Sequence, residues 1–180
     1  MVFDGSSFAL DKNGNCISHC KSFEEDILYT DLASHSTKNI KYATKCEDLF
    51  NALCLGIKDY FEKTKNKEAV IGLSGGIDSA VVACIASYAL GNKSVYGVSM
   101  PSKFSSEHSK FDAEELAKNL NINYQSISIQ NIVDKLEEEL SESFSGTSRD
   151  VSEENIQSRV RGNLLMAVSY THLRAHETTL

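Results

Sequence analysis

The sequence lacks the features of a membrane-bound, secreted or nucleic-acid-binding protein. No apolar run approaches the roughly 20 residues that cross a bilayer. The start, Met1 to Gly5, has neither the basic nor the apolar segment of a secretory signal. A surplus of basic residues is also missing, since the net charge is −7, and this argues against an electrostatic nucleic-acid surface. We therefore expect a cytoplasmic protein with no membrane and no nucleic-acid partner.

The cysteines do not form a ladder of paired C-x-x-C motifs. Their number, 5, is odd, which argues against a disulfide framework or a structural zinc site. Cys16, His19 and Cys20 form the only close cluster, and a metal site there would need a further ligand from elsewhere. We expect reduced, scattered thiols. The length of 180 residues suits one domain, or one domain with a fragment of another.

A short strand, a glycine turn and a helix follow one another from Val70 to Leu90. Gly75 and Gly76 allow the backbone to approach a ligand, and the helix that begins near Ile77 offers unpaired N–H groups and the positive end of its dipole. Ser74 and Ser79 can donate hydroxyls, and Asp78 can hold the magnesium that accompanies a polyphosphate. These features predict a phosphate-binding loop.

Two common phosphate loops are excluded at this turn, because neither Gly-x-x-x-x-Gly-Lys-Ser/Thr nor Gly-x-Gly-x-x-Gly occurs. The segment Ser74 to Ser79 instead resembles the Ser-Gly-Gly-x-Asp-Ser loop of the ATP pyrophosphatases, which cleave ATP between the α and β phosphates. That resemblance implies that the loop holds the departing pyrophosphate. An ordinary glycine turn between strand and helix is the alternative.

Strands and helices alternate from residue 45 onward. Apolar residues follow a helical stripe over 45–65, and the nearly all-apolar helix 77–90 is expected to be fully buried. A strand over 94–100, a helix over 106–120 and a strand over 124–128 complete the pattern of a parallel α/β sheet with flanking helices. Ligands of such sheets bind at the carboxyl ends of the strands, where Ser74 and Met100 emerge.

The first 31 residues are expected to be β-rich. Strands are predicted over 7–10, 16–19 and 26–29, with a hairpin turn at Asn13-Gly14. Residues 32–44 have no usable periodicity and are expected to form a linker, and the serine-rich stretch 141–152 is expected to be a surface loop.

Three stretches together resemble the glutamine-dependent NAD synthetases. They are the loop at 70–79, the run 96–102 (YGVSMPS) with 105–109 (SSEHS), and the run 154–166 (ENIQSRVRGNLLM). The start of the chain is similar to the end of that family's nitrilase-like glutaminase domain. The resemblance implies an adenine nucleotide alpha hydrolase-like fold, with 1–31 as the remnant of the glutaminase domain and 45–167 as a partial synthetase domain. The expected linker 32–44 lies between them, and 168–180 is expected to be an adapter-derived artefact.

The last of these segments has a separate basis. Residues 168–178 read VSYTHLRAHET, which is one reading frame of a transposase-type sequencing adapter. We exclude 168–180 from the fold, so His172 and His176 carry no metal-site prediction.

The family resemblance implies a reaction in which ATP activates the carboxylate of deamido-NAD as an acyl-adenylate. Ammonia derived from glutamine then displaces AMP to give NAD. The resemblance implies ATP and magnesium as cofactors and a homo-oligomeric parent enzyme, with this fragment inactive alone. It assigns no catalytic residue here, since the glutaminase trio lies upstream. ATP contacts fall on the loop residues Gly72, Leu73, Ser74, Gly75, Gly76, Ile77, Asp78 and Ser79, with Asp78 as metal ligand, and deamido-NAD contacts on Asn155 and Arg159.

Two other hypotheses remain open. The same loop serves other acceptors in GMP synthetase, asparagine synthetase and tRNA-thiolating enzymes, and only the stretch 154–166 argues against them. A nucleotide-binding module without catalysis is the third hypothesis. His108 is expected to have a surface or capping role rather than to act as a general base.

Overall fold

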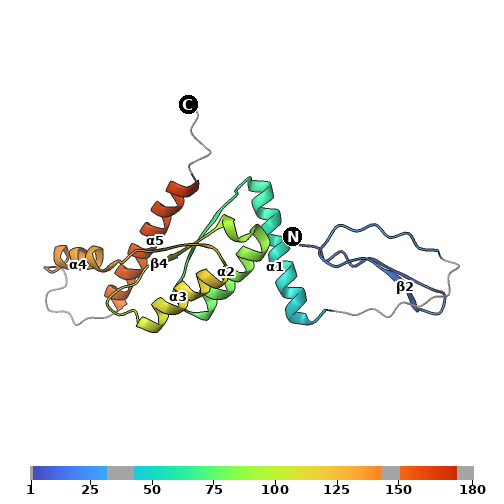
Figure 1. The fold of residues 1–180 in the computed structure, drawn as a ribbon, viewed down its shortest axis with the longest axis horizontal. Coiled ribbons are helices and arrows are strands. Elements are labelled where there is room, and N and C mark those ends of the chain that lie inside the picture. The colour runs from blue at the N-terminus through green and yellow to red at the C-terminus, as the bar shows by residue number, and fades with distance from the viewer. Residues whose placement is uncertain (1, 32–42, 143–150, 174–180) are drawn as a thin grey trace, which may run out of the picture. The chain divides into compact units, whose positions relative to one another are not determined.

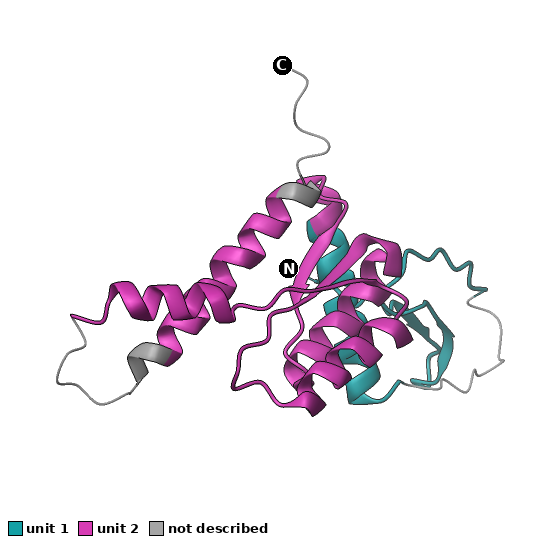
Figure 2. Cartoon of the chain, turned by 60° about the vertical axis from the view of Figure 1, so that its left-hand side comes forward, with its two compact units in different colours: residues 1–60 teal, residues 61–180 magenta. Residues whose placement is uncertain are grey.

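The computed structural model describes residues 2–31, 43–142 and 151–173, which fall into two units, 1–60 and 61–180 (Figures 1 and 2). The expected linker 32–44 lies mostly outside the described residues, as does most of the expected loop 141–152. Along the parts that are described, no helix is both long and apolar enough to cross a bilayer.

The first unit contains an antiparallel hairpin. Strand β1 (Phe8–Leu10) pairs with β2 (Cys16–His19), and Gly14 takes a positive φ of 83° in the turn between them. Asp11 organises this turn, because its Oδ1 accepts from the amides of Asn13 and Asn15 at 2.8 Å each. The prediction of a third strand over 26–29 is wrong, because these described residues form no strand in the structure. The Asp26 carboxylate instead accepts from the amide of Lys21 at 3.0 Å.

Helix α1 (Lys45–Thr64) begins with a reciprocal cap. The Thr44 amide donates to the Glu47 carboxylate at 2.7 Å, and the Glu47 amide donates to the Thr44 hydroxyl at 3.2 Å. The structure thus confirms the helix expected over 45–65, and this cap accounts for its start.

The second unit is a three-stranded parallel sheet with helices. Strands β3 (Ala69–Gly72), β4 (Val95–Ser99) and β5 (Asn123–Ser126) lie in the order β3-β4-β5. Helix α2 (Ile77–Leu90) and the short 3-10 helix η1 (Asn92–Ser94) connect the first two strands, and α3 (Glu107–Asn119) connects the next two. Helices α4 (Gln130–Glu139) and α5 (Val151–Leu173) follow. This confirms the parallel α/β class predicted from the sequence.

The two helices that connect the strands pack on the same face of the sheet. The buried core there is formed by residues of α2, α3 and β4 and by one residue next to each of β3 and β5: Leu73, Ala83, Ala86, Val95, Ala113, Ala117 and Ile122. Neighbouring residues of a strand face opposite sides of a sheet. Because Leu73 belongs to this core while a Cβ at Gly72 would lie 4.0 Å from Leu165 of α5, helix α5 packs on the opposite face.

Helix α2 departs from the prediction of full burial. Ala83, Ile85 and Ala86 are buried, but Ile77 is 75% and Tyr88 71% exposed. A helix that covers one face of a sheet buries a single stripe, and nothing in the described chain covers the outer side of α2. Apolar residues on all sides of α2 therefore did not mean that every side of the helix is buried.

Candidate functional site

The predicted phosphate loop lies where β3 ends and α2 begins. The Leu73 amide donates to the Val98 carbonyl at 2.8 Å and extends the pairing of β3 with β4. Gly76 is the N-cap of α2, with φ −94° and ψ 161°, and no side chain among the described residues caps the helix. The first amides of α2, at Ile77, Asp78 and Ser79, have no acceptor inside the helix. They offer N–H groups and the positive end of the helix dipole to an anion.

Two serine hydroxyls hold the loop in its bent shape. The Ser79 hydroxyl donates to the Gly76 carbonyl at 2.9 Å and accepts from the Ser74 amide at 3.2 Å. Its single proton is thereby used, so the 3.1 Å contact between the two hydroxyls has Ser74 as the donor. The Gly76 amide, which the sequence predicts to face an anion, donates to the Ser74 hydroxyl at 3.2 Å. The neutral contacts of Ser74 are ones that an anion can replace with stronger bonds.

Gly75 is the point at which the loop touches α3. Its φ is +79°, and a Cβ built there would lie 2.2 Å from the carbonyl oxygen of Ser109 and 2.6 Å from its Cα. No other residue fits this position, because a side chain would face both the wrong backbone conformation and a main chain in its path. The first turn of α3 therefore lies directly against the loop.

A cavity of about 400 Å³ opens beside the loop at the carboxyl ends of β3 and β4. This is the edge that the strand order predicts for a ligand. Its lining comes from the end of β3, the end of β4 with the turn after it, the start of α3, and α5: Gly72, Leu73, Ser74, Ser99, Met100, Pro101, Ser105, Ser109, Lys110 and Arg161.

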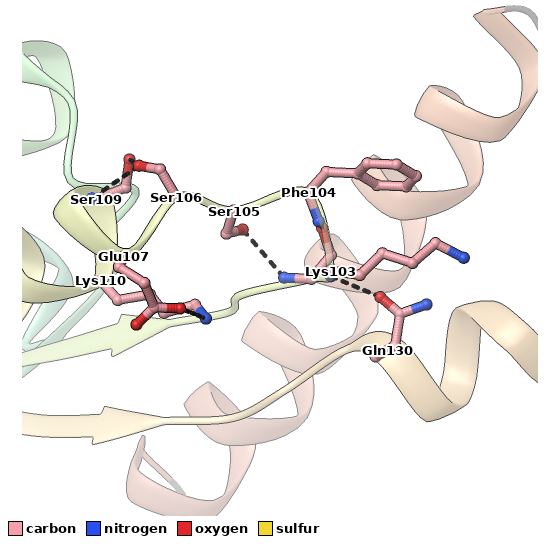
Figure 3. Close-up of polar contacts among 9 residues, drawn as sticks. Lys103, Phe104, Ser105, Ser106, Glu107, Ser109, Lys110 and Gln130 are labelled. Atoms are coloured by element: carbon pink, nitrogen blue, oxygen red, sulfur yellow. Dashed lines mark hydrogen bonds and ion pairs between the residues drawn. The ribbon is translucent and has the colours of Figure 1, made fainter.

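The segment between β4 and α3 forms one wall, and serine hydroxyls shape it (Figure 3). The Ser102 amide donates to the Ser105 hydroxyl at 3.0 Å, and the Ser106 hydroxyl caps α3 by accepting from the Ser109 amide at 3.1 Å. Gln130 of α4 holds the segment from outside: its Oε1 accepts from the Lys103 amide at 2.7 Å.

A second contact orients the Gln130 side chain. Its Nε2 donates to Asp134 at 2.6 Å, and the Lys103 ammonium lies 3.6 Å from the same carboxylate oxygen. Gln130, Asp134 and the Lys103 side chain thus join the wall to the first turns of α4.

Two cationic side chains line the cavity, Lys110 from α3 and Arg161 from α5. Arg161 Nε donates to the Met100 carbonyl at 3.2 Å, so this residue of α5 is bound to the end of β4. Partial burial lowers the pKa of the Arg161 guanidinium from its ordinary value. Because arginine remains charged at neutral pH, its other N–H groups are available to an anion.

The donors near the loop fit a magnesium ion that arrives with a nucleotide. Magnesium is usually held by one or two carboxylates and by substrate phosphates, with waters completing the shell. Asp78 offers one exposed carboxylate in the first turn of α2, and Ser74 and Ser79 offer hydroxyl oxygens. Among the described residues no group of three or more His, Cys, Asp or Glu side chains could hold a metal on its own.

The structure separates the predicted site residues into two groups. Gly72, Leu73 and Ser74 line the cavity, and the rest of the loop through Ser79 continues from them into α2. Asn155 and Arg159 lie on α5 with exposed side chains, and neither lines the cavity. His108 is exposed and also lies outside the lining.

Sequence reasoning missed five lining residues, Pro101, Ser105, Ser109, Lys110 and Arg161. The serines and Arg161 stood inside the motif runs without being singled out. Arg161 lies four residues after Gln157, which the structure shows to be buried, so it faces the inner side of α5; the sequence alone does not show which side that is. Lys110 had no signal beyond its place in the first turns of a helix after a strand end.

Comparison with known proteins gives one consistent family. The family model described as NAD synthase matches residues 49–175. A glutamine-dependent NAD(+) synthetase of Synechocystis sp. is 45% identical over 175 residues, covering 94% of this chain and 31% of the relative. The chain thus spans about a third of the length of that curated relative.

Solved structures agree with the sequence match. A glutamine-dependent NAD+ synthetase of Acinetobacter baumannii, in complex with ADP, is 33% identical with a TM-score of 0.87, over 94% of this chain and 33% of that one. An NH3-dependent NAD synthetase of Campylobacter jejuni is 31% identical with a TM-score of 0.64, over 73% of this chain and 55% of that one.

Proposed function

Because the chain belongs to the NAD synthase family, we propose that it carries the ATP-binding part of a glutamine-dependent NAD synthetase. The whole enzyme would use ATP and ammonia from glutamine to convert deamido-NAD into NAD. In the first step a carboxylate oxygen of deamido-NAD attacks the α phosphorus of ATP, and the bond to the bridging oxygen breaks to release pyrophosphate. In the second step ammonia attacks the acyl carbon, and AMP leaves.

The proposed role of this chain is positioning and charge neutralisation. The first amides of α2 would bind phosphate oxygens, and the Ser74 hydroxyl would exchange Ser79 for an anionic acceptor. Arg161, which also lines the cavity, would meet the anionic reactants from α5. Magnesium, when bound with the nucleotide, would neutralise phosphate charge, with Asp78 as its protein ligand. No side chain needs to act as a nucleophile in this half of the reaction.

The remaining assignments follow the same family pattern as proposals. Asn155 and Arg159 are four residues apart on one exposed face of α5, a placement that allows them to contact deamido-NAD together. Residues 1–31 would belong to the glutaminase domain and 45–167 to the synthetase domain. Since the chain spans about a third of its curated relatives, we propose that it binds ATP without completing the reaction alone, and that the whole enzyme is a cytoplasmic homo-oligomer.

This proposal rests on one observation: the cavity lies at the carboxyl ends of β3 and β4, beside the uncapped start of α2. Its test is calorimetric titration of the 180-residue chain with ATP and magnesium. We expect Asp78→Ala to weaken the magnesium-dependent binding about tenfold, the loss typical of one ionic contact. Asp112→Ala, an exposed carboxylate outside the cavity, is the matched control and should leave binding unchanged. Failure of the unaltered chain to bind ATP would refute the proposal.

The acceptor is tested separately on the whole enzyme. Pyrophosphate release that requires deamido-NAD, and the appearance of NAD with AMP in equal amounts, are the expected results. Release that instead requires a different nucleotide or amino-acid acceptor would show that the ATP site serves another reaction.

A further inference from the structure

The two cations of the cavity differ in what already holds them. Arg161 is bound through Nε to a main-chain carbonyl, a contact that fixes its guanidinium at the wall. Lys110 Nζ instead contacts the Glu107 carboxylate at 2.7 Å (Figure 3). Glu107 does not line the cavity, and its side chain is 89% exposed. Lys110 therefore borders the cavity, while its partner Glu107 lies in solvent outside it.

Lys110 also stands beside the phosphate loop. It follows Ser109, whose carbonyl and Cα are the atoms nearest to a Cβ built at Gly75. A lysine side chain has a flexible four-carbon stem and a compact ammonium that can change direction without moving the backbone. From this position the ammonium can turn from the outer face of α3 toward the space above the loop.

We propose that Lys110 exchanges Glu107 for the β and γ phosphates of the nucleotide and then holds the departing pyrophosphate. This inference rests on the proposed ATP site and adds a ligand to it. An exposed lysine–glutamate pair contributes little to stability, so releasing Glu107 is easy. A charge-assisted contact with a phosphate inside a cavity is stronger than the same contact in open solvent. The carboxylate of Glu107 thus competes with phosphate for one ammonium.

If Glu107 and phosphate compete for Lys110, substitutions of Lys110 and of Glu107 change phosphate binding in opposite directions. Substitutions in a merely structural ion pair would not do so. We expect Lys110→Met to weaken binding of magnesium pyrophosphate to the 180-residue chain about tenfold, equivalent to about 1.4 kcal/mol. Glu107→Gln should tighten the same binding about twofold, the effect of removing a weak competing pair. The double variant should bind pyrophosphate as Lys110→Met does, because without the ammonium Glu107 no longer competes with phosphate for a ligand. Binding of AMP, which lacks the β and γ phosphates, should not change in any variant.

A matched control exists on α4. Lys135 pairs with Glu138, three residues on, at 2.9 Å and with Glu139 at 3.2 Å, and it does not line the cavity. Lys135→Met should leave pyrophosphate binding unchanged, which separates a local contact from a general loss of positive charge.

The outcomes separate this inference from the proposal beneath it. If the unaltered chain binds ATP and pyrophosphate but Lys110→Met binds pyrophosphate equally well, or Glu107→Gln weakens binding, the inference is overturned while the ATP site stands. If the unaltered chain binds neither ligand, both are overturned. Thermal unfolding of each variant shows that a loss of binding does not come from a loss of folded protein.

Discussion

Replacing Gly75 with alanine tests whether the loop and α3 are in contact. The added Cβ would meet the Ser109 main chain at 2.2 Å, and the residue would have to keep a φ of +79°. The backbone conformation alone costs about 1–3 kcal/mol for a residue other than glycine. Overpacking against a main chain adds typically about 1–3 kcal/mol more. We therefore expect Gly75→Ala to lower the free energy of unfolding by about 2–6 kcal/mol, a large share of the roughly 5–15 kcal/mol typical of a domain.

Gly91→Ala is the control that isolates the contact. Gly91 also has a positive φ, +86°, but a Cβ there would have no neighbour within 4 Å in the described parts of the chain. It should carry the backbone cost and none of the steric cost. The difference in destabilisation between the two variants is then the free energy needed to move Ser109 and the first turn of α3 away from the loop.

Urea unfolding followed by circular dichroism measures both values, provided that the slope with urea is the same in each variant. Titration with ATP and magnesium adds a second readout, since a displaced α3 changes the wall of the cavity. Equal destabilisation by Gly75→Ala and Gly91→Ala would refute the contact between loop and helix, and with it the geometry of the site.

Two further substitutions or reactions test other parts of the structure. Gln130→Ala removes the acceptor of the Lys103 amide, so we expect tryptic cleavage after Lys103 to accelerate severalfold while cleavage after Lys93 stays the same. Equal rates of cleavage after Lys103 in parent and variant would show that Gln130 does not hold this segment. Burial raises the pKa of the Cys54 thiol, so at pH 8 less of it is thiolate and maleimide should modify the exposed Cys46 first; equally fast labelling of Cys54 would show that it is not buried.

The alternation of elements could be predicted from the sequence because each signal is local. The stripe of α1, the glycine turn after β3 and the order of strands and helices all follow from residues within a few positions of one another. The edge of the sheet that holds the cavity followed from topology. Failures arose where the outcome depends on distant partners. Residues 26–29 have strand-like composition but form no strand in the structure, and α2 has an apolar outer side that no described element covers.

The site shows the same division. Gly72 to Ser74 could be placed at the cavity because a contiguous motif carries them. Lys110 and Arg161 could not, because their approach to the loop depends on how α3 and α5 pack, and two arginines two residues apart on α5 differ only in which side they face. Arg159, chosen for its motif position, is exposed, whereas Arg161 reaches the end of β4.

The bond from Arg161 to the Met100 carbonyl joins residues 61 positions apart, and it bears on how the protein matures during synthesis. The residues of the sheet, the loop and helices α1 to α4 are all translated before Arg161. The early product would have a phosphate loop but an open side where α5 later packs. Ribosome-bound chains halted on either side of Arg161 should therefore differ in how well they retain a nucleotide.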